Sequence, residues 1–312
     1  MFDFGNDTLL NDESYLYNVD DSINVDECFV NIIDAYSCDE ALYQVPLNAY
    51  VVGLNIDESL LSDSQYGFTY EEYAEFIADY AGGADPILGW ADREWYWNQM
   101  MSYLYFDTHT EDGLLDIDNA AFRESMEYAQ NIPQEFADLY VPKMSVRELR
   151  NFGAELDAHC IKANYRLLGF PSYEAKTPMC RMENSIAITS CTVSEDASLS
   201  FLQLSLSYDV QVESTRYNPI NVNAFESVAR RELTRANNLI EQERGINDYY
   251  TEDLISYYED CLKSAQVGAI SDPITINIIF EEIDAYFQGQ KTLDDVIPII
   301  EDRVNNMIAE RT

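Results

Sequence analysis

The sequence predicts a helix-rich α/β fold with two lobes. The chain has 312 residues, which is more than one compact core usually needs. Helix signals are more frequent along it than strand signals. The strand candidates are short and cover residues 43–53, 165–169 and 184–190. Helical segments separate them, which favours crossover connections over an all-β meander.

The charge of the chain excludes some partners. Against 57 Asp and Glu residues there are 18 Lys and Arg residues, so the formal net charge is -39, and no basic side chain precedes Arg93. Nucleic-acid binding needs clustered cations, as does attachment to an anionic lipid surface, so we expect neither. The hydrophobic content of 47% and aromatic content of 13% are too high for an acidic disordered chain, so we expect a folded protein.

Targeting and membrane segments are not evident in the sequence. Residues 1–17 have neither the basic region nor the apolar region of a signal peptide. No stretch approaches 18 consecutive apolar residues, the usual requirement for a membrane span. We therefore expect a soluble chain.

Local signals place the first two helices. Thr69 and Glu72 form a capping box, and apolar residues follow at helical spacing until Gly82 ends the helix. The second helix is expected over residues 118–130, with Asp118 as its cap.

Three further helices are expected after residue 190. One opens at Ser194, and its inward face is predicted to carry Ala197, Phe201, Leu204 and Tyr208. Residues 274–287 form the next helix, which stops at Gly289. Thr292 caps the last helix, and Pro298 should bend it because proline removes one N–H and crowds the preceding turn.

The sequence contains few of the motifs that bind metals or cofactors. The only histidines are His109 and His159, too few for a histidine triad or a multi-histidine metal site. No glycine-rich phosphate loop is present, and the acidic residues of 112–118 do not alternate as a calcium loop requires. The six cysteines are interpreted as buried thiols, with Cys28 and Cys38 the only pair close enough to suggest a local disulfide. We expect no cofactor and no metal.

Six segments occur in an order that is informative as a set. They are DEALYQVPL at 39–47, the helix at 122–133, LGFPS at 168–172 followed by NSIAITS at 184–190, the helix at 194–208, YNPINVNAF at 217–225, and FEE…FQGQKTLDDV at 280–296. In this order, over nearly the whole chain, they resemble extracellular solute-binding proteins, family 1, of carbohydrate ABC importers.

The resemblance implies a periplasmic-binding-protein-like type II fold, in which crossover strands form a hinge between two α/β lobes. It assigns 1–48 to the remainder of the N-terminal lobe, 49–168 to the C-terminal lobe, 169–216 to a return segment in the N-terminal lobe, and 217–312 to C-terminal lobe helices. Members of the family begin with a lipoprotein signal and further βα units, so the first lobe is expected to be incomplete.

Two contacts between distant segments follow from this architecture. Residues 43–53, 170–172 and 217–225 should lie close together as the links between the lobes. The two helices on either side of Gly289 should pack against the helices within residues 69–130, which would make one lobe mainly helical.

The function that the resemblance implies is capture of a sugar or oligosaccharide between two lobes and its delivery to the membrane permease of an ABC importer, without enzymatic chemistry. The protein is expected to be a monomer, extracellular and anchored to the cell surface in its full-length form, with the signal peptide absent from this chain. Two alternatives remain open: an acidic glycoside hydrolase, and an acidic interaction domain without a small-molecule site.

Aromatic side chains are the candidate ligand contacts. The three tryptophans are Trp90, Trp95 and Trp97, and they cannot all enter one helical stripe. Trp90 follows a Pro/Gly-punctuated loop and is the leading candidate to stack on a sugar ring. Further candidates at the crossovers are Tyr50, Phe170, Tyr173 and Tyr217, for which packing of the hinge is the competing interpretation. The acidic surroundings favour a neutral or cationic solute, so we expect a neutral oligosaccharide.

Overall fold

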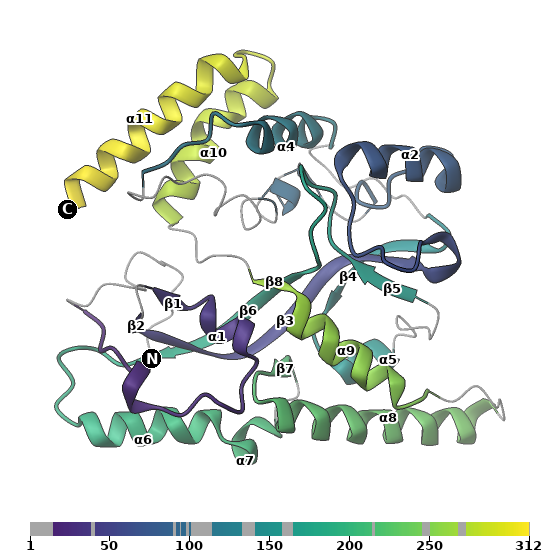
Figure 1. Cartoon of the computed structure of the whole chain (residues 1–312), viewed down its shortest axis with the longest axis vertical. Helices are drawn as coiled ribbons and strands as arrows, with labels where there is room; N and C mark the ends of the chain where they lie inside the picture. The colour runs from purple at the N-terminus through teal and green to yellow at the C-terminus, as the bar shows by residue number, and fades with distance from the viewer. Residues whose placement is uncertain are drawn as a thin grey trace.

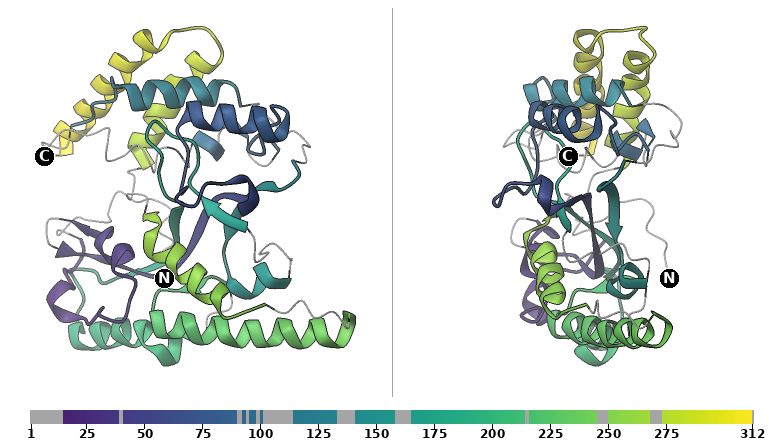
Figure 2. Two further views of the ribbon diagram at one scale, coloured as in Figure 1. Left: turned by 45° about the vertical axis from the view of Figure 1, so that its right-hand side comes forward. Right: turned by 90° about the vertical axis from the view of Figure 1, so that its right-hand side faces the viewer.

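The fold was analysed in a computed structural model of the chain (Figure 1). The structure describes residues 15–38, 41–89, 92–93, 95–97, 100, 114–132, 141–157, 165–213, 216–244, 250–267 and 273–311. Trp90 lies outside these residues. Two groups of helices occupy opposite ends of the long axis, with strands between them, and the turned views of Figure 2 show the same separation.

A long central strand organises the sheet. This strand, β3 (Gln44–Asp57), pairs antiparallel with four others: β4 (Met144–Leu149), β5 (Tyr165–Leu168), β6 (Met179–Ala187) and β7 (Asn218–Pro219). β8 (Gln266–Val267) runs parallel to β6, so the sheet is mixed. The three predicted strands are confirmed as parts of β3, β5 and β6, whereas β4 was not predicted.

Alternate side chains of β3 enter two different hydrophobic cores. The upper core, in the orientation of Figure 1, receives Tyr50, Val52, Leu54 and Ile56. The lower core receives Val45, Ala49 and Val51. Successive side chains of a strand point to opposite faces, so one strand can serve both cores as it passes from one lobe to the other. The two lobes are thereby joined through a continuous backbone.

The upper lobe is mainly helical. Its helices are α2 (Tyr70–Ala81), α4 (Ala120–Gln130), α10 (Pro273–Phe287) and α11 (Leu293–Arg311), with the short 3-10 helix η3 (Glu58–Leu60) nearby. Tyr73 and Phe122 share the upper core with Ile283 and Val296. This confirms that the two final helices pack with those of residues 69–130.

Helix ends in this lobe test the predicted caps. Thr69 and Glu72 form the predicted capping box of α2, which ends at Gly82 in the left-handed region with φ 62°. The prediction of Asp118 as the second cap is wrong. The side chain of Asn119 accepts the hydrogen bond of the Phe122 N–H instead, at 2.9 Å. Asp118 binds Arg123.

The lower lobe contains α1 (Val30–Asp34), α5 (Phe152–Asp157), α6 (Glu195–Leu206), α7 (Tyr208–Gln211), α8 (Val222–Arg244) and α9 (Asp253–Ser264), with η2 (Asp20–Ser22) and the small hairpin of β1 (Ser37–Cys38) and β2 (Ala41–Leu42). Phe225 of α8 and Tyr258 of α9 share the lower core with Ile32 of α1. The boundaries expected from the sequence place residues 217–312 together in one lobe. In the structure, α8 and α9 pack in the lower core, whereas α10 and α11 pack in the upper core.

The predicted inward face of α6 is wrong. Phe201 is 61% exposed, and Leu204 and Tyr208 are also exposed, whereas Leu202 and Leu206 are buried. Two apolar stripes run along this helix, so periodicity alone could not choose between them.

A disulfide between Cys28 and Cys38 is also contradicted, because Cys28 is a free thiol. Cys28, Cys180 and Cys261 are buried, as expected, and Cys191 is exposed. Within the described ranges, no helix is long and apolar enough to cross a membrane.

Candidate functional site

The hinge segments meet where β3 leaves the lower core and enters the upper core. Ala49 of β3 pairs with Asn218 of β7. The Asn218 backbone N–H donates to the Arg150 carbonyl, and its side-chain amide donates to the Leu149 carbonyl, both at 3.0 Å. The predicted proximity of 43–53 and 217–225 is therefore confirmed.

Two tyrosines stack at this point. The rings of Tyr50 and Tyr217 have centroids 5.9 Å apart and an interplanar angle of 27°. The guanidinium carbon of Arg150 lies 5.7 Å from the centroid of the Tyr50 ring, and that of Arg216 lies 5.2 Å from the Tyr217 ring. Two cations thus contact the two rings of one stacked pair.

A third arginine belongs to the same face of the sheet. Tyr50 of β3 lies opposite Arg181 of β6, and directly opposite residues of an antiparallel pair project to the same face. We call Tyr50, Tyr217, Arg150, Arg181 and Arg216 the waist cluster.

One carboxylate, that of Glu148, accompanies the waist cluster. Glu148 of β4 lies opposite Val52, and it accepts a hydrogen bond from Arg150 Nε at 2.6 Å. Burial acts to lower the pKa of Arg150, but the hydrogen bond and charge of Glu148 outweigh it, so the pKa is raised. The Arg150 side chain is 49% exposed, which leaves this cation within reach of a solute.

The other predicted contacts lie in different surroundings. Phe170 is fully buried and packs edge-on against Trp95 and Tyr96 in the upper core, with ring centroids 5.8 and 6.4 Å away. Tyr173, just beyond the Thr69–Ser172 bridge, is 42% exposed. Trp90 lies outside the described residues.

A buried carboxylate that the sequence analysis did not single out lies beneath the aromatic residues of the upper lobe. Asp85 accepts hydrogen bonds from the Tyr73 hydroxyl at 2.7 Å, the Tyr128 hydroxyl at 2.6 Å and the Ile87 N–H at 2.8 Å. Burial raises the pKa of Asp85, and these hydrogen bonds oppose the shift. Burial likewise raises the pKa of Tyr73 and Tyr128 well above the usual value. All three groups are committed to one another, so the network supports the lobe.

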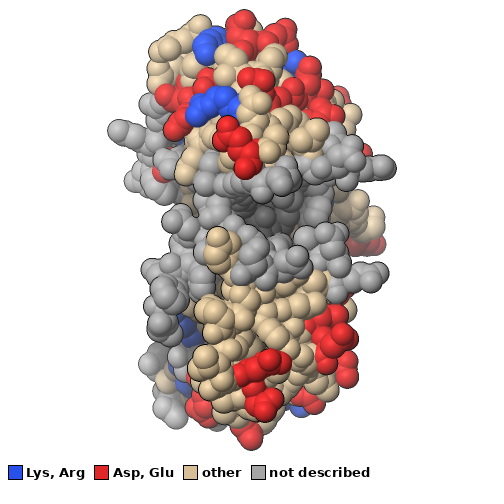
Figure 3. All heavy atoms as spheres, turned by 90° about the vertical axis from the view of Figure 1, so that its left-hand side faces the viewer, with Lys and Arg blue, Asp and Glu red and all other residues tan. Residues whose placement is uncertain are grey.

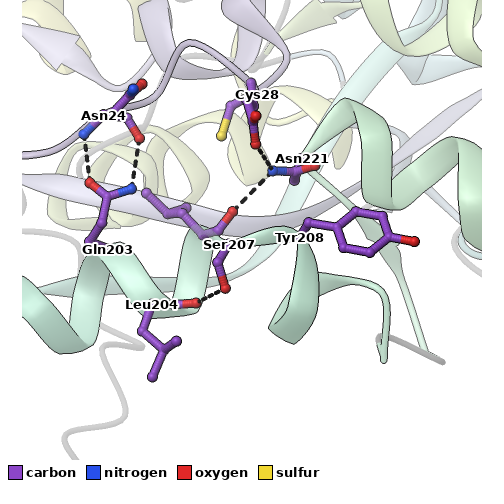
Figure 4. A pocket seen from close by; sticks show the side chains of 9 residues that line it. Asn24, Cys28, Gln203, Leu204, Ser207, Tyr208 and Asn221 are labelled. Atoms are coloured by element: carbon purple, nitrogen blue, oxygen red, sulfur yellow. Dashed lines mark hydrogen bonds between the residues drawn. The ribbon is translucent and has the colours of Figure 1, made fainter.

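A hollow of about 440 Å³ lies on the lower lobe, between residues 24–28 and the end of α6 (Figure 4). Asn24 and Gln203 exchange two hydrogen bonds across it, of 2.6 and 3.1 Å. The Asn221 amide donates to Glu27 and to the Leu206 carbonyl, both at 3.2 Å. These polar groups of the hollow are thus paired within the protein.

A smaller hollow of about 260 Å³ lies between α4 and the turn from α10 to α11. There Arg123 is held by Asp118 and Asp294, at 2.6 and 2.7 Å. The waist cluster lies where β3 passes between the two cores, so its position makes it the better candidate for a ligand site. Among the described residues, no group of three His, Cys, Asp or Glu side chains could hold a metal ion.

Basic side chains are scarce in this chain, and three of them belong to the waist cluster. On the face in Figure 3, acidic side chains gather at the upper end and along the edge of the lower lobe, with few basic ones among them. At the waist cluster, Arg150 is paired with Glu148, and the guanidinium groups of Arg181 and Arg216 belong to the same cluster. The candidate site therefore brings several cations together in a strongly acidic chain.

Comparison with solved structures shows the fold. No family model and no curated protein matches the sequence. A putative oligosaccharide periplasmic-binding protein from Synechococcus sp. MITs9220 matches at 13% identity and TM-score 0.62, over 95% of this chain and 81% of that one. The sugar-binding protein MalE from Xanthomonas citri matches at 15% identity and TM-score 0.61, over 95% and 80%. An extracellular solute-binding protein family 1 from Alicyclobacillus acidocaldarius matches at 14% and 0.54, over 95% and 80%.

The predicted periplasmic-binding-protein-like fold with two lobes is confirmed by these similarities. β3 passes between the two lobes, with β7 paired beside it. Tyr50 and Tyr217, two of the residues predicted from sequence, lie on those strands or beside them. The three arginines of the waist cluster were not predicted, and only the register of β3 with its neighbours identifies Arg181 as a member.

Proposed function

We propose that the chain is the substrate-binding component of a carbohydrate ABC importer, which captures a sugar or oligosaccharide between its two lobes. The observation that carries this proposal is the stacked Tyr50–Tyr217 pair at the point where β3 passes between the two cores. The two rings are buried and hold Arg150 and Arg216 at this point, and the N–H donors of these exposed guanidinium groups can bind sugar hydroxyl oxygens.

The proposed capture of a ligand needs no covalent chemistry. Capture needs complementary surfaces and a hinge, and a ligand that contacts both lobes stabilises the closed state. The lobes are joined through β3 and its short partner β7, which provide such a hinge. We therefore propose a monomeric, non-enzymatic protein that works outside the cell, is anchored to its surface in the full-length form, and passes its ligand to a membrane permease. Trp90 is proposed as a further ligand contact.

Binding without turnover is the test. The full chain is titrated by calorimetry with a panel of neutral and acidic oligosaccharides, and the saccharide is recovered and analysed afterwards. The proposal predicts saturable binding, a higher melting temperature in the presence of the ligand, and an unchanged saccharide. Cleavage of the saccharide would support a glycoside hydrolase instead, and a lack of binding across the panel would contradict the proposal.

A further inference from the structure

The distribution of cations points to a narrower class of ligand. Only 18 Lys and Arg residues serve the 312 residues of the chain. Three of them belong to the waist cluster, and they come from different elements. Arg150 directly follows β4, Arg181 lies within β6, and Arg216 lies just before β7. Their convergence on one tyrosine pair is not a consequence of the composition of the chain.

We propose that the waist cluster selects a saccharide that carries a carboxylate, such as a sugar acid within an oligosaccharide. This inference rests on the proposed function of the same site, and it names the class of substrate. The planar guanidinium group presents a fork of N–H donors that matches both oxygens of a carboxylate. The stacked tyrosines are buried, and their rings hold Arg150 and Arg216 in place for this contact.

The arginines retain hydrogen-bonding capacity for such a ligand. A guanidinium group carries five N–H donors. Glu148 engages Nε and Nη2 of Arg150. Arg216 is exposed, and its contact within the described residues is the face of the Tyr217 ring. Both cations can therefore donate to a ligand without losing the contacts that hold them.

The large negative charge of the chain does not prevent this selection. At physiological ionic strength, interactions between exposed charges are largely screened beyond about 8 Å. Contacts between a carboxylate and a guanidinium act well within that distance and are strengthened when closure of the lobes removes water. The sequence-based expectation of a neutral solute followed from the overall charge, whereas the exposed guanidinium groups of Arg150 and Arg216 favour an acid.

A matched pair of ligands isolates the carboxylate. Trigalacturonate and its neutral methyl ester have the same sugar rings and differ in charge. The full chain and the Arg216→Gln and Arg150→Lys variants are titrated with both ligands and with a sulfated trisaccharide. Arg230→Gln is the control, because the Arg230 side chain is exposed on α8 and pairs with Glu226. Circular dichroism and melting curves establish that each variant is folded.

The inference predicts that the acid binds at least tenfold more tightly than its ester, that Arg216→Gln removes most of this preference, and that Arg230→Gln keeps it. Equal affinity for acid and ester, or a preference that survives in both Arg216→Gln and Arg150→Lys, would overturn the inference and leave the proposed function intact. Tighter binding of the sulfated sugar would overturn the assignment to a carboxylate. If no saccharide binds, neutral or acidic, the proposed function fails as well.

Discussion

Tyr50 and Tyr217 stack ring against ring, with centroids 5.9 Å apart and planes inclined by 27°, although they come from segments far apart in the sequence. Tyr50 belongs to the strand that serves both cores, and Tyr217 directly precedes the short strand β7. Their contact joins two of the three segments that the sequence predicts to link the lobes.

Replacement of Tyr217 by leucine tests the stacked pair. Leucine keeps an apolar side chain but removes the ring that stacks on Tyr50 and holds Arg216, so Tyr217→Leu should weaken saccharide binding by roughly tenfold or more, about 1.4 kcal/mol. Tyr217→Phe keeps the ring and should retain most of the affinity. Tyr80→Ala, on the exposed end of α2, is the control. Calorimetry with a saccharide that binds the full chain measures the effect, and equal affinity in Tyr217→Leu would remove this ring from the site.

The Asp85 network should contribute strongly to stability. Asp85→Ala leaves the hydroxyls of Tyr73 and Tyr128 without their acceptor in a buried site. We expect a loss of about 2–4 kcal/mol in the free energy of unfolding, measured by urea denaturation. Asp79→Ala, an exposed position on the same helix as Tyr73, should change it by less than about 0.5 kcal/mol. Similar losses in the two variants would show that the network is not the cause.

The pH dependence of stability has a definite sign at Asp85. Its pKa is raised in the folded state, so the folded protein holds this proton more tightly than the unfolded chain does. The resulting stabilisation is complete below the unfolded pKa of about 3.9, and it is lost as the pH rises through the folded value. Asp85→Asn has no titrating group at this position. As the pH rises from the unfolded to the folded pKa, the free energy of unfolding of the native protein should therefore fall relative to that of Asp85→Asn. A difference that does not vary with pH would contradict the raised pKa.

The corrected face of α6 gives a further prediction. Leu202 is fully buried, so Leu202→Ala should destabilise the protein by about 2–5 kcal/mol. Phe201→Ala removes a larger side chain from an exposed position and should cost less than about 0.5 kcal/mol. Denaturant unfolding of the two variants makes the comparison. A larger loss of stability in Phe201→Ala than in Leu202→Ala would support the buried face predicted from sequence.

Local signals explain which elements the sequence could reveal. α2 was predicted to within a residue because Thr69 and Glu72 cap it and Gly82 ends it, and these signals act within one helical turn. α8 was missed because its first residues were interpreted as part of a crossover. The Asn221 side chain accepts a hydrogen bond from the Ala224 N–H, and this asparagine is the signal that could have marked the helix start.

Only part of the candidate site could be predicted from the sequence, because the rest depends on contacts between distant segments. Tyr50 and Tyr217 could be proposed because aromatic residues at crossovers are few. The grouping of Arg150 and Arg181 around Tyr50 depends on ring contact and strand register between distant segments, which composition does not encode. Asp85 was one of 57 acidic residues, and only tertiary packing distinguishes it from the others.

Closure of the lobes over a saccharide is the central claim, and a distance measurement tests it most directly. Spin labels on unnatural amino acids are placed at Asp196 of α6 and Glu310 of α11, two exposed positions in opposite lobes. Pulsed electron resonance then measures the distance between them with and without a saturating oligosaccharide. The account predicts a shorter distance with the saccharide and no change in Tyr217→Leu at the same concentration. An unchanged distance in the native protein, with binding confirmed by calorimetry, would contradict it.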